Sequence, residues 1–282
     1  MIENKRDNII VTGVPRSGTT LVCALLNNLE NTICLREPEE HVKWLRDVGS
    51  ADEYVDRIKN DFQDIRANIK LGKAIFDRSS VGGEMLTNYF PDRKDVNERR
   101  KVSFEMKNVD YQMLKNKFTL ATKHNVEYAS VLPELIQSKQ FLFICPIRNP
   151  ISTILSWNTL ATPVSQGAIP MSRYYWPEVN ESIVNVDSLL HRQVIIFDMF
   201  CKRFYEYKND INVVFYEDLL KNQNGLSGIV GRKQQAKIEL TNKNKSIQYD
   251  WDLAQKIYLL IKRHAKYIHY FYQDSDLRAL TA

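Results

Sequence analysis

The 282-residue chain lacks any apolar run long enough to cross a membrane, since a spanning helix needs about 20 such residues. Its first residues, MIENKRDN, run directly into an apolar segment and show no signal peptide. It has only four cysteines, whose spacing fits neither a metal site nor a disulfide framework. We therefore expect a cytoplasmic protein without a metal site or a membrane span.

The sequence also has no internal repeat, no low-complexity run and no linker rich in proline, glycine or serine. These absences predict a single domain over residues 1–282. The formal net charge of +5 is low for a dedicated nucleic-acid-binding protein, but it is compatible with an anionic ligand. With 44% hydrophobic and 26% charged residues, the composition is that of an ordinary globular protein.

Short apolar runs alternate with segments of helical periodicity. NIIVTGV (8–14) predicts a buried strand, and TTLVCALLNNL (19–29) predicts the helix that follows it. Further strands are predicted at 118–122, 141–147 and 211–218, and further helices at 52–69, from Pro150 onward, at 187–207 and at 251–271. The alternation indicates an α/β fold, a parallel sheet with helices on both faces. Ligands of such sheets bind at the carboxyl ends of the strands.

The turn between the first strand and helix, VTGVPRSGTT, resembles a phosphate-binding loop. Gly13 and Gly18 have the spacing of a Walker A loop and Thr20 matches its hydroxyl residue, but Thr19 stands where the lysine belongs. Arg16 supplies a cation three positions earlier. Backbone N–H groups and the helix dipole at such a turn favour an anion. The predicted binding residues are Pro15, Arg16, Ser17, Gly18, Thr19 and Thr20.

A second anion site is predicted in IRNPISTILSW (147–157). Arg148 follows the strand at 141–147, Asn149 is a candidate N-cap and Pro150 suits the first helical position. Ser156 comes eight residues after Arg148, about two turns into the helix. An arginine and a hydroxyl placed in this way can converge on one phosphate.

Together these stretches resemble the 5′-phosphosulfate loop and the 3′-phosphate site of sulfotransferases that use 3′-phosphoadenosine 5′-phosphosulfate (PAPS). The family also carries a Tyr-Glu-Asp-Leu sequence after a strand, which matches Tyr216 to Leu219 here. The resemblance spans residues 11–219 and implies a P-loop-like, sulfotransferase-type fold. It also implies PAPS as co-substrate and no metal, because the ligand of the loop is then a single 5′-phosphate that bears a sulfuryl group.

The stretch 11–37 looks most like the tyrosylprotein branch of this family, which shares V-P-R-S-G-T-T-L. The C-terminal K-G-x-x-G-x-W-K segment, with which the cytosolic branch holds the cofactor, is absent. Lys243 and Lys245 in TNKNKS are the candidates that remain for that task. The chain also lacks the membrane anchor and the disulfide pattern of the tyrosylprotein branch.

Sulfuryl transfer requires a stabilised leaving group, a cation near the sulfuryl oxygens and a base for the acceptor proton. Arg16 is suited to stabilise the leaving 5′-phosphate. By resemblance, Lys123 contacts the sulfuryl group and Tyr216 binds adenine. The base is either Glu37, which matches the tyrosylprotein branch, or His124, which adjoins Lys123 as a histidine does in the cytosolic branch.

Other side chains are given structural roles. Glu217 and Asp218 are expected to organise their loop, and His41 is interpreted as a histidine on a helix surface. The aromatic loop SRYYWPE (172–178) either anchors on the core or packs against a substrate.

The acceptor hydroxyl is not identified by the sequence, and a glycan, a lipid, a phenol and a peptide tyrosine are all candidates. Two other functions compete with sulfuryl transfer. One is a small-molecule kinase with a degenerate P-loop, in which Asp218 holds Mg²⁺. The other is a non-catalytic nucleotide-binding protein that has kept the loops.

Overall fold

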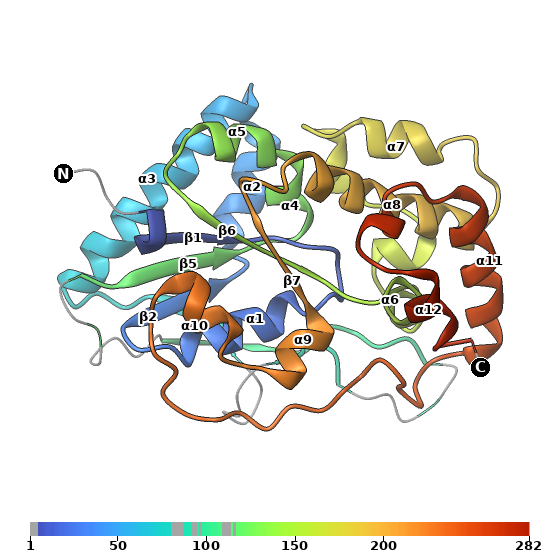
Figure 1. The fold of residues 1–282 in the computed structure, drawn as a ribbon. Coiled ribbons are helices and arrows are strands. Elements are labelled where there is room, and N and C mark those ends of the chain that lie inside the picture. The colour runs from blue at the N-terminus through green and yellow to red at the C-terminus, as the bar shows by residue number, and fades with distance from the viewer. Residues whose placement is uncertain are drawn as a thin grey trace.

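The computed structural model describes residues 5–79, 87–91, 95, 98–108, 114 and 117–281. Five parallel strands form the central sheet in the order β2-β5-β1-β6-β7 (Figure 1). These strands are β1 (Asn8–Val11), β2 (Thr32–Arg36), β5 (Thr119–Lys123), β6 (Leu142–Ile147) and β7 (Asn212–Phe215). A separate antiparallel ribbon consists of β3 (Phe76–Ser79) and β4 (Glu105–Asn108).

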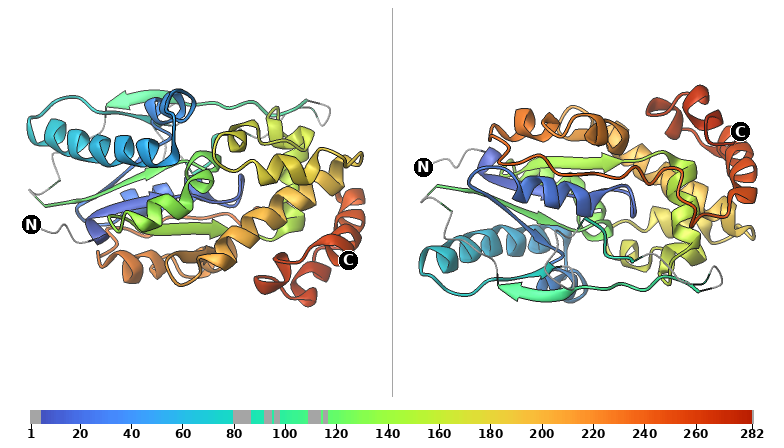
Figure 2. Two further views of the ribbon diagram at one scale, coloured as in Figure 1. Left: turned by 90° about the horizontal axis from the view of Figure 1, so that it is seen from above. Right: turned by 90° about the horizontal axis from the view of Figure 1, so that it is seen from below.

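The helices cover both faces of the sheet (Figure 2). They are α1 (Thr19–Asn27), α2 (Glu39–Asp47), α3 (Ala51–Lys70), α4 (Val126–Ser130), α5 (Leu132–Gln137), α6 (Pro150–Asn158), α7 (Glu178–Ile183), α8 (Leu189–Glu206), α9 (Tyr216–Lys221), α10 (Gly225–Val230), α11 (Ala254–His264) and α12 (Asp274–Arg278). No described helix is both long and apolar enough to cross a membrane.

Successive residues of β1 alternate between two apolar layers. Ile9 and Val11 pack in a cluster with α1, α9 and α10, whereas Ile10 packs in a larger cluster with α3, α5 and α8. Because both faces of the strand are buried, its sequence is continuously apolar, as parallel sheets require. The predicted α/β fold with helices on both faces is therefore confirmed.

The local signals for helix starts also hold. Asn149 caps α6 by accepting a hydrogen bond from the Ile151 amide, and Pro150 is the first helical residue. The α3 helix begins after Ser50, whose side chain accepts from the Glu53 amide. Cys23 and Cys145 lie within apolar stretches of the sequence, and both are buried.

Two predicted elements end earlier than expected. The strand at 211–218 ends at Phe215, and Tyr216 begins α9 instead. The last helix ends at His264 rather than at residue 271. There the Asp198 carboxylate accepts hydrogen bonds from the amides of Lys266, Tyr267 and Ile268, which turns the chain away from the helix axis.

Three strands were not predicted. β2 was not recognised because TICLR is short, and β3 and β4 were not recognised because they are polar and mostly lie near the surface. The omission of β2 matters most, since this strand carries Glu37 to the edge of the sheet where the other site residues lie.

Candidate active site

All five parallel strands end at one edge of the sheet, and each is followed by residues that the sequence marks as functional. In spatial order along this edge lie Glu37 after β2, Lys123 and His124 at the end of β5, the loop 12–18 after β1, Arg148 after β6 and Tyr216 after β7. Residues that are far apart in the sequence thus form one row.

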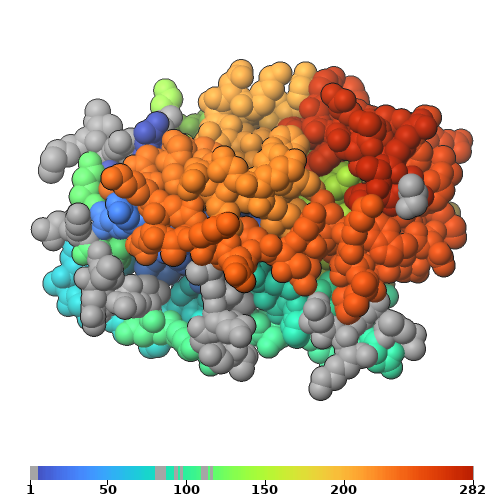
Figure 3. Space-filling view, turned by 60° about the horizontal axis from the view of Figure 1, so that its bottom comes forward, coloured from blue at the N-terminus to red at the C-terminus, as the bar shows by residue number. Residues whose placement is uncertain are grey.

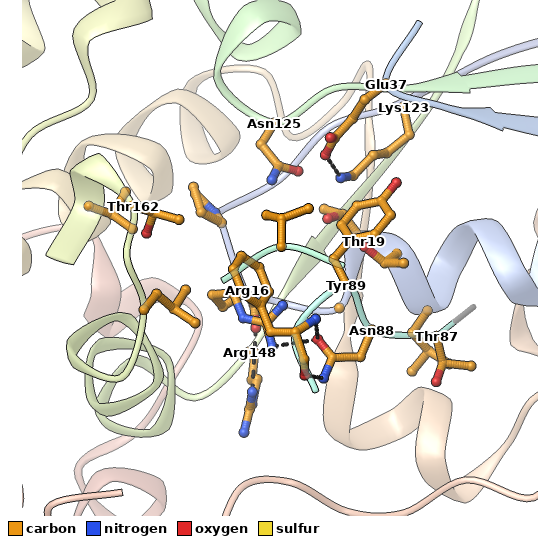
Figure 4. A pocket seen from close by; sticks show the side chains of 18 of the residues that line it. Arg16, Thr19, Glu37, Thr87, Asn88, Tyr89, Lys123, Asn125, Arg148 and Thr162 are labelled. Atoms are coloured by element: carbon orange, nitrogen blue, oxygen red, sulfur yellow. Dashed lines mark hydrogen bonds and ion pairs between the residues drawn. The ribbon is translucent and has the colours of Figure 1, made fainter. Parts of the chain in front are cut away.

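A cavity of about 750 Å³ opens along this row (Figure 4). Besides the strand ends, its walls come from described residues between 87 and 102, from 160–171 and from 239–249. Figure 4 shows the Glu37–Lys123 pair at one side of the cavity and Arg16 beside Arg148 farther along.

The loop after β1 is shaped by close contacts. A Cβ atom on Gly13 would lie 2.7 Å from the Pro146 carbonyl oxygen, and Gly18 has a φ of 97°. Ser17 donates its hydroxyl to the Val14 carbonyl and also lies 2.7 Å from that of Pro146, so this predicted ligand residue holds the loop itself together. Helix α1 begins without a side-chain cap. Its first amides are therefore available to an anion.

Arg16 lies in the cavity and is held by polar and aromatic neighbours. Its Nη2 donates to Asn88 Oδ1 at 2.8 Å, and its guanidinium lies 4.7 Å from the centre of the Phe90 ring. Among the described residues we find no ion pair between Arg16 and a carboxylate. Enclosure by protein, together with the nearby Arg100 and Arg148, lowers the pKa of Arg16 to about 9. Such an environment favours binding of an anion.

The second predicted site is assembled around Arg16 as well. Arg16 Nε lies 3.4 Å from Ser156 Oγ, and Arg148 Nη1 lies 3.4 Å from the Arg16 carbonyl oxygen. Trp157, which the sequence did not single out, donates its indole N–H to the Pro15 carbonyl and ties helix α6 to the loop. Both predicted anion sites are therefore contiguous.

Arg148 also organises the segment 239–249. Its Nε donates to Asn244 Oδ1 at 2.6 Å and its Nη2 donates to the Tyr249 hydroxyl at 3.0 Å. Burial alone would raise the pKa of Tyr249, but the charge of Arg148 outweighs it and lowers that pKa. Lys243 contributes its backbone carbonyl to Arg148, whereas no role in the cavity is seen for Lys245.

The residues after β7 complete this side of the cavity. Tyr216 packs its ring against Gly18 and lies 4.8 Å from the Arg148 guanidinium. Glu217 accepts hydrogen bonds from the Asn149 amide, the Asn244 side chain and the Tyr272 hydroxyl. It thus organises the loop as expected. Figure 3 shows that orange-coloured residues of this part of the chain cover a large area of one face.

Glu37 lies between two cations. Its Oε1 accepts a hydrogen bond from Lys123 and its Oε2 accepts one from Arg78 of β3. The backbone of Glu37 is in the left-handed region with a φ of 53°. Burial alone would raise the pKa of Glu37, but Lys123 and Arg78 outweigh it, so the pKa lies below the usual 4.5. The group is therefore an ionised carboxylate at neutral pH.

His124 is held by its neighbours. Its Nε2 donates to the Pro38 carbonyl at 3.0 Å, and its Nδ1 lies 3.6 Å from the Glu127 carboxylate. The side chain is only 3% exposed. Nε2 is thus engaged in a hydrogen bond, and Nδ1 faces the Glu127 carboxylate.

The structure decides between the interpretations of two further stretches, His41 and the aromatic loop 172–178. His41 is not on a helix surface but fully buried, bonded to Tyr128 and Asp61. In the aromatic loop, Trp176 packs on Phe200 in the core, and this loop does not line the cavity.

The Asp218 side chain is 70% exposed and pairs with Lys221, so the carboxylate that the kinase interpretation needs is outside the cavity. In the part of the chain that the structure describes, no group of three metal-ligating side chains is found.

A protein-family model described as "Sulfotransferase domain" matches residues 6–226. Two solved structures resemble the chain weakly. The mouse sulfotransferase SULT7A1 complexed with PAP has 13% sequence identity and a TM-score of 0.35 over 99% of this chain and 76% of that one. The sulfotransferase STF1 from Mycobacterium tuberculosis H37Rv has the same identity and TM-score over 100% and 77%. No curated protein sequence matches the chain.

Proposed function

The chain belongs to the sulfotransferase family, and from this premise we propose that it transfers a sulfuryl group from PAPS to the hydroxyl of an acceptor. The observation that carries the proposal is the row of strand ends. A candidate base and a cation for the sulfuryl group lie at one end, the phosphate loop is central, and the residues for the 3′-phosphate and adenine lie at the other end.

The donor would lie along this row. Its 5′-phosphosulfate would bind the loop 13–20 at the start of α1, its 3′-phosphate would bind Arg148 and Ser156, and its adenine would pack near Tyr216. Arg16 supports this proposal, because it forms no ion pair with a carboxylate of the described residues and an enclosed guanidinium is stabilised by a phosphate. Arg148 and Ser156, the residues of the proposed 3′-phosphate site, both contact Arg16 and so adjoin the loop that would bind the 5′-phosphosulfate.

In the proposed reaction the acceptor oxygen attacks sulfur in line with the leaving 5′-phosphate. The bond from sulfur to the bridging oxygen breaks, and its electron pair stays on the phosphate, where Arg16 and the amides of α1 stabilise it. Lys123 neutralises the sulfuryl oxygens. Glu37 accepts the acceptor proton, since it is the ionised carboxylate beside Lys123.

The acceptor is proposed to be a hydroxyl compound with an apolar body, such as a phenol or a lipid alcohol. Tyr89 lies 5.2 Å from the Lys123 ammonium, and the cavity is also lined by the aliphatic and aromatic side chains of Val42, Phe90, Val102, Leu160, Val164, Ile169 and Met171. The cations there are already engaged, because Lys123 and Arg78 both bind Glu37. A glycan would require more free polar groups than this wall offers.

Two assays test the proposal. Adenosine 3′,5′-bisphosphate should raise the melting temperature without metal, whereas ATP with Mg²⁺ should raise it less. Donor with radiolabelled sulfur should label 2-naphthol faster than N-acetylglucosamine. Stabilisation by ATP with Mg²⁺ alone would contradict the donor, and preferential labelling of the sugar would contradict the apolar acceptor.

A further inference from the structure

The ribbon of β3 and β4 is fastened to the end of β2 by two consecutive ion pairs. Arg36 pairs with Asp77, and its backbone amide donates to Asp77 Oδ1 at 2.5 Å. The next residues along both strands, Glu37 and Arg78, form the second pair. The ribbon is thus linked directly to the candidate base, in a way that no signal in the sequence predicts.

Arg78 is fixed on its other side as well. Its guanidinium lies 4.5 Å from the centre of the Phe104 ring and 5.9 Å from that of Tyr89. Its side chain is 15% exposed. A planar cation stacked on aromatic rings has a restricted orientation, so it can hold a carboxylate oxygen in one place.

Lys123, the other partner of Glu37, has two competing ligands if the proposed function is correct. In the structure it binds Glu37 Oε1, and its ammonium lies 5.2 Å from the centre of the Tyr89 ring. In the proposed reaction the same ammonium neutralises the sulfuryl oxygens of the donor. The ammonium has three N–H donors but a single charge, so sharing it with the donor would weaken its bond to Glu37.

We propose that Arg78 is a positioning residue for the base, which keeps one oxygen of Glu37 fixed when the donor draws Lys123 away from the other. This inference rests on the proposed function. In this arrangement the donor frees Oε1 of Glu37 from Lys123, while Arg78 stays bound to Oε2 and preserves the orientation of the carboxylate. Donor binding and the base are thereby coupled, because both oxygens of the ionised Glu37 carboxylate are bound by cations until a sulfuryl group is present.

The charges around Glu37 determine the expected pH dependence. The groups that face it or act on it are Lys123 and His124 from β5, Arg78 from β3, Glu127 from α4 and the phenol of Tyr89, while Glu39 and Glu40 of α2 are exposed. Arg78 is one of two cations bonded to the carboxylate. Removing an opposite charge at this range raises a carboxyl pKa by about one unit or more.

The test compares Arg78→Ala with Arg78→Lys and, as a matched control, Asp77→Asn. In Arg78→Ala the acid limb of the pH profile of kcat/KM should move up by about one pH unit or more. Arg78→Lys should keep the limb near its original pH because the charge is retained. Asp77→Asn weakens the neighbouring pair of the same ribbon, so it controls for loosening of the ribbon and should leave the limb in place.

A second readout does not depend on turnover. The ¹³C carboxyl resonance of Glu37, assigned with Glu37→Gln, should titrate at higher pH in Arg78→Ala than in the unmodified protein. The proposal would be overturned if, in Arg78→Ala, neither the pH at which Glu37 titrates nor the pH of the acid limb changed. An equal movement of the acid limb in Asp77→Asn would overturn it as well. If the unmodified protein transfers no sulfuryl group, the proposed function fails, and the titration still decides whether Arg78 controls Glu37.

Discussion

At the scale of single residues, the cavity gathers backbone conformations that are otherwise rare. Four non-glycine residues of the described chain have a positive φ, and two of them, Arg16 and Glu37, face the cavity. Such conformations cost about 1–3 kcal/mol each and persist where the surroundings over-determine them. Here the contacts of the loop fix Arg16, and Lys123 and Arg78 fix Glu37. Two residues with specific roles in the proposal thus have backbone conformations that are costly for side chains other than glycine.

The identity of the base leads to the first prediction. Glu37→Gln keeps the size of the side chain but cannot accept a proton, so turnover should fall by about 10²–10⁴-fold. Because Glu37 lies at the opposite end of the row from Arg148 and Tyr216, donor affinity should be retained. His124→Ala should cost far less, since Nε2 is engaged by the Pro38 carbonyl and Nδ1 faces the Glu127 carboxylate.

Steady-state kinetics with radiolabelled donor, together with calorimetric titration of adenosine 3′,5′-bisphosphate, measure both effects. Loss of turnover in His124→Ala with near-normal activity in Glu37→Gln would reverse the assignment. The histidine would then have to leave the Pro38 carbonyl in the complex with both substrates.

The second prediction concerns His41 and stability. Burial lowers the pKa of His41 from its usual 6.5, although the hydrogen bond to Asp61 opposes this. The unfolded chain therefore binds a proton more readily than the folded protein. Stability is fully present above pH 6.5 and decreases as the pH falls below it, by at most about 1.4 kcal/mol per pH unit for one proton.

Urea unfolding at pH 8, 7, 6 and 5 tests this, with His41→Asn as the comparison. The variant should be less stable at pH 8, because Tyr128 and Asp61 lose a buried partner. Its stability should depend less on pH between 7 and 5. Parallel curves for the two proteins would show that another group controls the pH response.

At the scale of elements, the sequence predicted those helices, strands and loops whose formation depends on residues that are close together in the chain. The strand β1, the loop 12–18 and the start of α6 depend on neighbouring residues, and the sequence revealed them. The ribbon of β3 and β4 depends on Asp77 and Arg78 meeting the end of β2, about 40 residues earlier in the chain. A contact of that kind leaves no periodicity, so Arg78 was not found. Asn244 and Tyr249 were missed for the same reason.

The segment 239–249 gives the third prediction. Asn244 is buried and bonded through its side chain to both Arg148 and Glu217. Asn244→Ala would leave a buried guanidinium and a half-buried carboxylate each short of a partner, so the unfolding free energy should fall by about 1–3 kcal/mol. Because the same contacts hold the segment against α6, proteolysis within 239–249 should become faster.

Lys245→Ala is the control, since Lys245 adjoins Asn244 and is exposed. It should change neither the unfolding free energy nor the cleavage rate appreciably. Urea unfolding measures the first effect, and mass spectrometry of the fragments produced by a protease that does not cut at lysine measures the second. Equal behaviour of both variants would mean that Asn244 does not anchor the segment.

At the scale of the whole molecule, the parallel sheet itself creates the site. Carboxyl ends of parallel strands meet at one edge, so five separate stretches of sequence deliver their side chains to one cavity. The crossover connections place the strands in the order β2-β5-β1-β6-β7, which is not their order along the chain. The sequence therefore showed which residues come together, but not that Glu37 and Tyr216 lie at opposite ends of the row.

The last prediction follows from the charges of this cavity as a whole. Cations line it in the positions that the proposed donor requires, with Lys123 at the sulfuryl end, Arg16 at the loop and Arg148 at the far end. Of the carboxylates that line it, Glu37 is bound by Lys123 and Arg78 and Glu127 lies 3.6 Å from His124, and among the described residues no three metal-ligating side chains form a group. Transfer from radiolabelled PAPS should thus proceed at an unchanged rate in excess EDTA, and added Mg²⁺ should not accelerate it. A loss of turnover in EDTA that Mg²⁺ restores would contradict this, and would mean that the side-chain cations do not suffice to neutralise the leaving group.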